Sequence, residues 1–210
     1  MTKKQRAEAA IDALKKRYPQ GICSLRYADP LQLLIATRLS AQCTDARVNM
    51  VTPALFEAFP TLDAFASATP EEVAPYIRSC GLYQTKAKDI VAMCVMLRDV
   101  YGGQMPDTVE ELTKLPGVGR KTANLVCGDI FGKPAVVTDT HCIRIAGRLG
   151  LTDGSKDPYK VEMQLRKILP PEESNAFCHR IVLFGRDICT ARSPRCGECP
   201  LREHCSGKAE

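Results

Sequence analysis

The segment LPGVGRKTAN, residues 115–124, joins a tight turn to the start of a helix. Gly117 and Gly119 allow backbone angles closed to other residues and let a ligand approach the chain closely. The helix predicted over 119–131 begins with N–H groups that lack intrahelical partners and with the positive end of its dipole. With a short helix predicted over 108–115, this unit is a helix–hairpin–helix that can hold a phosphate through its backbone without reading bases. An ordinary corner between two helices, with glycine for steric reasons, gives the same pattern.

Lys121 lies in the first turn of the second helix, where the helix dipole disfavours a positive charge. The same field favours the neutral amine that imine chemistry needs, although a solvated lysine gives the same pattern. Asp139, within VVTDTHCIRIAGR (136–148), opens another predicted helix, where an aspartate is more often only a cap. A chemical role requires Asp139 to face Lys121, and sequence spacing does not show this.

Four of the eleven cysteines lie close together near the end of the chain. They are Cys189, Cys196, Cys199 and Cys205, separated by six, two and five residues. The close pair lets two thiolates reach one metal centre, and four thiolates suit either tetrahedral zinc or a [4Fe–4S] cluster. The two outlying cysteines favour the larger cluster, but the pattern separates iron–sulfur from zinc only weakly.

The rest of the chain has the period of helices. Apolar residues recur at i, i+3, i+4 and i+7, as in Ala87, Ile90, Val91 and Cys94. Alternating strand patterns are absent, so the chain of 210 residues predicts an all-α fold of about ten helices, without a parallel sheet. Pro53 interrupts one apolar pattern and predicts a kink or a new helix start.

Composition limits the possible partners and the compartment. The net charge of +5 permits a polyanionic partner without requiring one. No apolar run is long enough for a membrane helix, and the N-terminus has the pattern of a charged helix rather than a secretory signal. Cysteines in a chain without an export signal favour free thiols, so we expect a cytoplasmic protein.

These segments together resemble the endonuclease III family of DNA glycosylases. LPGVGRKTA resembles the helix–hairpin–helix of the family, VVTDTH the segment of its catalytic aspartate, and C-x6-C-x2-C-x5-C its [4Fe–4S] loop. LSAQCTD (39–45) and GLYQTKA (81–87) also fit. The order and spacing of the motifs match, and the resemblance covers essentially the whole chain.

The resemblance implies an all-α fold of two lobes. A six-helix lobe with the helix–hairpin–helix would span residues 22–133. The second lobe would join residues 1–21 to 134–210 and hold a [4Fe–4S] cluster on the four clustered cysteines. Double-stranded DNA would bind across the cleft between the lobes, where Lys121 and Asp139 face each other. We expect a monomer associated with DNA.

The resemblance also implies a bifunctional glycosylase and abasic-site lyase of base excision repair, acting on oxidised pyrimidines flipped out of duplex DNA. The Lys121 amine would displace the base and form an imine, Asp139 would stabilise the developing positive charge, and β-elimination would cut the strand 3′ to the lesion. Gln42 and Leu82 match residues that fill or wedge the vacated stack. The other expected DNA contacts are Gly117, Val118, Gly119, Arg120, His141, Arg192 and Arg195.

Three other interpretations differ in what they require. The related adenine glycosylases typically lack the hairpin lysine and carry a glutamate in the segment that corresponds to LSAQCTD, and this chain has none there. A non-enzymatic DNA-binding module would use Lys121 only as a phosphate contact and Asp139 only as a cap. A zinc-stabilised helical interaction protein would need zinc rather than iron in the cysteine tail.

Overall fold

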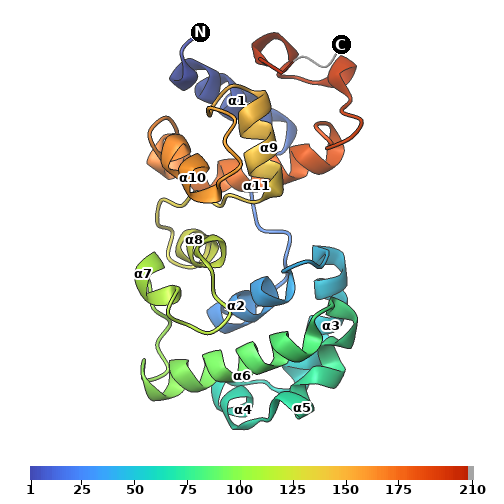
Figure 1. The fold of residues 1–210 in the computed structure, drawn as a ribbon, viewed down its shortest axis with the longest axis vertical. Helices are drawn as coiled ribbons and strands as arrows, with labels where there is room; N and C mark the ends of the chain where they lie inside the picture. Colours follow the sequence, from blue (N-terminus) through green and yellow to red (C-terminus); the bar gives the residue numbers. More distant parts are fainter. Residues whose placement is uncertain (208–210) are drawn as a thin grey trace. The chain divides into compact units, whose positions relative to one another are not determined.

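The computed structural model describes residues 1–207, and all regular structure in that range is helical (Figure 1). The all-α prediction is therefore confirmed. The chain divides into two compact units, one formed by Ser24–Phe131 and the other by Met1–Cys23 with Gly132–Glu210. Residues 208–210, which belong to the predicted cluster lobe, lie outside the described part.

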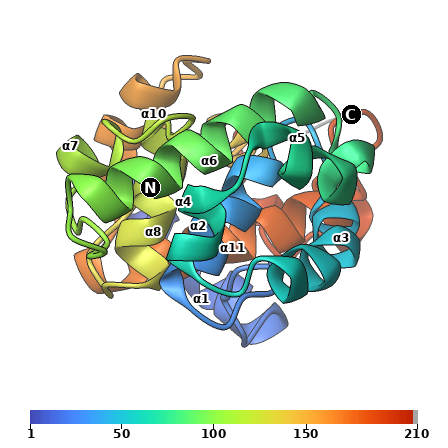
Figure 2. The same cartoon turned by 90° about the horizontal axis from the view of Figure 1, so that it is seen from below.

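The unit Ser24–Phe131 is built around the long helix α6 (Tyr83–Asp99), which packs against α4, α5 and η1 (Figures 1 and 2). Leu33, Leu55 and Ile90 are fully buried, and each such side chain contributes about 1.5–3 kcal/mol through the hydrophobic effect. The other helices of this unit are α2 (Pro30–Leu39), α3 (Asp45–Ala58), α4 (Leu62–Ser67), α5 (Pro70–Val73), the 3-10 helix η1 (Ala74–Cys80), α7 (Val109–Leu112) and α8 (Arg120–Asp129).

The second unit is centred on α11 (Pro171–Asp187), which packs against α1 (Lys3–Arg17) and α9 (Thr140–Arg148). The beginning and the end of the chain therefore share one core, formed by residues such as Leu14, Ile145 and Phe184. The remaining helices are α10 (Pro158–Arg166) and the 3-10 helices η2 (Cys196–Glu198) and η3 (Arg202–His204).

Local sequence sets where most of these helices begin. Asp29 caps α2 by accepting a hydrogen bond from the Gln32 amide at 2.9 Å, and a proline follows it at the first helical position. In contrast, α3 runs through Pro53 without a new start, so of the two predicted outcomes only a kink remains. Val48 and Leu55 are buried on either side of the proline, and this packing outweighs the hydrogen bond that it removes.

Among residues 1–207, no helix combines the length and the hydrophobicity that crossing a bilayer requires.

Candidate functional site

The turn between α7 and α8 contains two glycines, and their backbone conformations and surroundings differ. Gly117 has φ +72°, and a Cβ there would lie 2.6 Å from Arg38 Nε and 2.9 Å from Asp89 Cβ. Gly119 is extended, with φ −91° and ψ 172°, and a Cβ there would meet nothing within 4 Å. The predicted need for glycine-only angles is therefore right for Gly117 and wrong for Gly119, where the backbone instead borders open space.

The turn at Gly117 packs against an ion pair between α2 and α6. Arg38 on α2 donates to Asp89 Oδ2 on α6 from Nε at 2.8 Å and from Nη2 at 2.5 Å. The turn itself is closed by a hydrogen bond from the Val118 amide to the Leu115 carbonyl at 3.1 Å. Val118 is buried, so its side chain is not available to a ligand.

The start of α8 has the features of an anion site. Its N-cap is Gly119, which provides no side-chain hydrogen bond to the first turn. The amide groups there lack intrahelical partners, as in any α-helix. Arg120 is half-exposed and Lys121 is exposed, so two cationic side chains accompany the backbone donors. This arrangement favours an anion such as a phosphate. Contact of Lys121 with DNA stays a prediction.

Gln42 and Leu82 are the only residues other than glycine with positive φ within residues 1–207, at +54° and +47°. Both are exposed, and Leu82 keeps 62% of its surface accessible. Left-handed backbone is costly for side-chain-bearing residues and concentrates at functional positions. The two residues expected to enter the DNA stack are therefore the two that carry this strain, which no sequence pattern indicates.

In the other unit, Asp139 caps α9. Its Oδ1 accepts a hydrogen bond from the Cys142 amide at 2.7 Å, and the residue is half-exposed. Two residues earlier, the Val137 amide donates to Cys178 Sγ on α11 at 3.3 Å, which ties this segment to the core. His141 Nδ1 lies 3.2 Å from Arg144 Nη2. The cap role of Asp139 is thus present in the structure, and its pairing with Lys121 stays a prediction.

The four clustered cysteines line one cavity of about 210 Å³ in the same unit. All four are free thiols, and the 3-10 helix η2 brings Cys196 and Cys199 to the same turn. Burial raises the pKa of the Cys199 thiol, and the three neighbouring sulfurs raise it further. Four thiolates here repel one another, and a bound cationic centre relieves that repulsion. The donor set therefore fits a metal cluster.

Two arginines of α9, which sequence reasoning missed, hold the cysteine loop. Arg148 donates to the Thr190 carbonyl at 2.7 Å, to the Ala191 carbonyl at 2.9 Å and to Cys189 Sγ at 3.4 Å. Arg144 donates to the Cys189 carbonyl at 2.9 Å. Their spacing of four residues on one predicted helix was the available signal, because it places both on one face.

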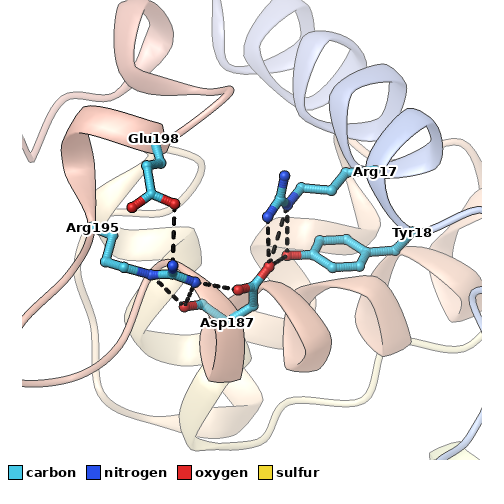
Figure 3. Close-up of polar contacts among 5 residues, drawn as sticks. All are labelled: Arg17, Tyr18, Asp187, Arg195 and Glu198. Atoms are coloured by element: carbon cyan, nitrogen blue, oxygen red, sulfur yellow. Dashed lines mark hydrogen bonds and ion pairs between the residues drawn. The ribbon is translucent and has the colours of Figure 1, made fainter.

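Arg195, expected to contact DNA, is engaged within the protein (Figure 3). Its Nε and Nη2 donate to the Asp187 carbonyl at 3.1 and 2.7 Å, its Nη2 also pairs with the Asp187 carboxylate, and its Nη1 lies 3.1 Å from Glu198 Oε2. Asp187 Oδ2 also accepts from Tyr18 Oη at 2.7 Å and from Arg17 Nη2 at 2.9 Å. This network ties the cysteine loop to α1 and α11, so the contacts favour a structural role for Arg195.

The all-helical fold, the hairpin before α8 and the four-thiol cavity agree with a class of DNA repair protein that the family models identify. Residues 35–171 match the model of the HhH-GPD superfamily base excision DNA repair proteins. Residues 189–205 match the iron–sulfur binding domain of endonuclease III. The protein therefore belongs to this superfamily and carries a [4Fe–4S] cluster, whose assignment to the four cysteines stays a prediction.

Full-length similarity narrows the class. The chain is 47% identical over 205 residues to endonuclease III of Synechocystis sp., covering 97% of this chain and 93% of the relative. It is 42% identical over 198 residues to endonuclease III of Bacillus subtilis, covering 94% and 90%. A trapped endonuclease III–DNA covalent intermediate has a TM-score of 0.93 and 45% identity, covering 99% and 97% of the two chains. The chain is a member of the endonuclease III family.

Proposed function

We propose that this chain excises oxidised pyrimidines from double-stranded DNA through an imine of Lys121 and then cleaves the strand 3′ to the site. The enzyme class, a DNA glycosylase and abasic-site lyase of base excision repair, follows from the family. The observation that carries the mechanism is the exposed Lys121 in an uncapped first helical turn, directly after the hairpin. A structural relative caught in covalent linkage to DNA supports it.

The hairpin backbone and the start of α8 hold a phosphate next to the lesion, which fixes the sugar relative to Lys121. The Lys121 amine attacks C1′ of the deoxyribose, and the damaged base leaves with the electrons of the glycosidic bond. The amine then loses a proton, the C1′–O4′ bond of the sugar ring breaks, and O4′ takes up a proton, which leaves the ring-opened, protonated imine. Removal of a proton from C2′ then breaks the C3′–O bond and completes β-elimination.

Asp139 stabilises the positive charge that develops on the sugar and assists proton transfer. Its cap hydrogen bond to the Cys142 amide uses Oδ1 and fixes the orientation of the carboxylate. The attachment of Val137 to Cys178 holds the segment before it. Because the Asp139 carboxylate is already held in place, it needs little rearrangement when positive charge develops on the sugar.

Gln42 and Leu82 replace the flipped nucleotide in the DNA stack. A polar side chain can satisfy the orphaned base, and an apolar one can replace the lost stacking. The exposure of both residues and their left-handed backbone support this proposal. Arg192 is exposed and makes no ion pair within residues 1–207, so we assign it, rather than Arg195, to phosphate contact.

The cluster would be held by the four cysteines that line the common cavity. When bound, it cross-links a segment that has little apolar core of its own, which orders the loop carrying Arg192. We further propose that the protein acts as a monomer on DNA in the cytoplasm.

The test is borohydride trapping on a duplex that contains one thymine glycol. We compare the wild type, Lys121→Ala and the control Lys114→Ala, which removes an exposed lysine that precedes the hairpin and pairs with Glu111. A covalent protein–DNA band should form with the wild type and Lys114→Ala and be absent with Lys121→Ala.

A band of normal intensity from Lys121→Ala refutes the assignment of the nucleophile. Base release by the wild type without trapping indicates a monofunctional glycosylase. Binding of the wild type without trapping or base release, on this substrate and on abasic DNA, favours the non-enzymatic module.

A further inference from the structure

Lys86 is a fully buried lysine in the first turn of α6. Burying an ammonium group is costly, and the positive end of the helix dipole adds to the cost. Burial accordingly lowers the pKa of Lys86. The compensation comes from two main-chain oxygens, because Nζ donates to the Leu39 carbonyl at 2.8 Å and to the Cys80 carbonyl at 2.6 Å.

Both carbonyls stand at the ends of helices. Leu39 is the last residue of α2, and Cys80 is the last residue of η1. Carbonyls at a helix C-terminus lack intrahelical partners and carry partial negative charge, so they are good acceptors for a buried ammonium. One nitrogen atom therefore connects the ends of two separate helices.

The two residues with left-handed backbone lie two or three positions after these ends. Gln42 comes shortly after Leu39, and Leu82 comes shortly after Cys80. The turn that contains Gln42 is closed by a hydrogen bond from the Cys43 amide to the Ser40 carbonyl at 3.1 Å. The Leu82 carbonyl accepts from the Lys86 amide at 3.0 Å, so Lys86 holds that loop through its backbone as well as its side chain.

We propose that Lys86 is a positioning residue that sets the spacing and conformation of the Gln42 and Leu82 loops, so that both side chains enter the DNA stack together. This inference rests on the proposed function for its consequence in DNA binding. Its structural part, a clamp between two loops, stands on the contacts of Lys86 alone.

The first experiment measures amide hydrogen exchange of the free protein for the wild type, Lys86→Met and Lys160→Met. Methionine keeps most of the buried stem but removes the ammonium, and Lys160→Met removes an exposed lysine from the first turn of α10. Lys86→Met should speed exchange in both loops roughly tenfold relative to the buried amides of α2. Lys160→Met should leave the loops unchanged.

The internal reference in α2 keeps this experiment decisive if Lys86→Met is less stable overall. Global destabilisation speeds exchange of the loops and of α2 alike, whereas a lost clamp speeds the loops alone. Equal protection of the loops in wild type and Lys86→Met, or a change in only one loop, overturns the proposal.

The second experiment is a double-mutant cycle on binding to a duplex with a stable abasic analogue. Lys86→Met should raise Kd about tenfold, in line with the loss of a charge-assisted hydrogen bond. In a Leu82→Ala background the same change should raise Kd less than about twofold, because the residue that Lys86 positions is already gone. Independent, additive losses contradict the coupling.

A further comparison separates positioning from a general structural defect. Imine trapping on single-stranded abasic DNA needs no opening of a base stack, so Lys86→Met should keep its rate there while losing rate on duplex DNA. Equal loss on both substrates counts against the proposal. If the wild type itself forms no imine, the proposed function fails, and the exchange experiment still decides whether Lys86 clamps the two loops.

Discussion

The contrast between Gly117 and Gly119 gives the sharpest test of the hairpin. In Gly117→Ala, the left-handed backbone costs about 1–2 kcal/mol for a residue with a side chain. The new Cβ also overlaps Arg38 and Asp89, and weakening their hydrogen-bonded ion pair costs about 1.5–3 kcal/mol. Alanine also lowers the conformational entropy of the unfolded chain, which stabilises the folded state by about 0.4–1 kcal/mol.

The net expectation for Gly117→Ala is a loss of about 1.5–4.5 kcal/mol, or a fall in Tm of roughly 3–18 °C. The Arg38 side chain can move, but Asp89 Cβ is fixed to the backbone of α6, so the overlap cannot be relieved entirely by rotation. Gly119→Ala should change stability by less than about 0.5 kcal/mol, because the less favourable N-cap and the entropy gain nearly cancel.

The assay is thermal unfolding followed by far-UV circular dichroism, together with binding to a duplex that carries an abasic analogue. Gly119→Ala should melt like the wild type yet bind DNA about tenfold more weakly, because its methyl group occupies the space where a phosphate approaches the backbone. The reasoning is refuted if Gly117→Ala keeps the wild-type Tm, or if Gly119→Ala melts as low as Gly117→Ala.

Cys199→Ala should remove the visible absorbance of the iron–sulfur cluster, since the cavity then offers three thiolates; full retention of iron would exclude Cys199 as a ligand. Arg195 holds the cysteine loop to Asp187, so Arg195→Ala should speed cluster loss on dilution and change the salt dependence of DNA binding little. Arg192→Ala should instead flatten the salt dependence of DNA binding and leave the cluster intact. The opposite pattern would reverse the two roles. Burial raises the pKa of Cys94 from 9.0 to about 12, so the folded protein retains a proton that the unfolded chain releases. Stability should therefore fall between these pH values, by about 1.4 kcal/mol per pH unit from this group. Urea denaturation should show a shallower alkaline decline for Cys94→Ala, and an unchanged slope would contradict the attribution.

The all-helical fold, the family and the cluster could be predicted because their signals are local in sequence. Helical periodicity depends on neighbours three and four residues apart, and the cysteine spacing lies within one short segment. The cap role of Asp139 was similarly readable. The continuity of α3 through Pro53 could not be predicted, because burial of side chains on both sides of the proline overrides its local effect.

The contacts of Arg195 and Lys86 could not be predicted from residue type and helical pattern. Arg195 lies in a basic loop, and this pattern indicates a phosphate contact. In the folded chain, however, its guanidinium donates to Asp187 and Glu198. Lys86 has the pattern of an ordinary helical lysine, yet its ammonium is buried between two helix ends.

The sequence by itself determined which chemical groups are present and which helices carry them: a lysine after a hairpin, an aspartate at a helix start and four clustered thiols. Only the tertiary structure decided which groups are committed to holding the fold and which remain exposed to a ligand. The physical reason is that propensity and capping act within a few residues, whereas burial, ion pairing and left-handed backbone at Gln42 and Leu82 are set by segments that meet only after folding.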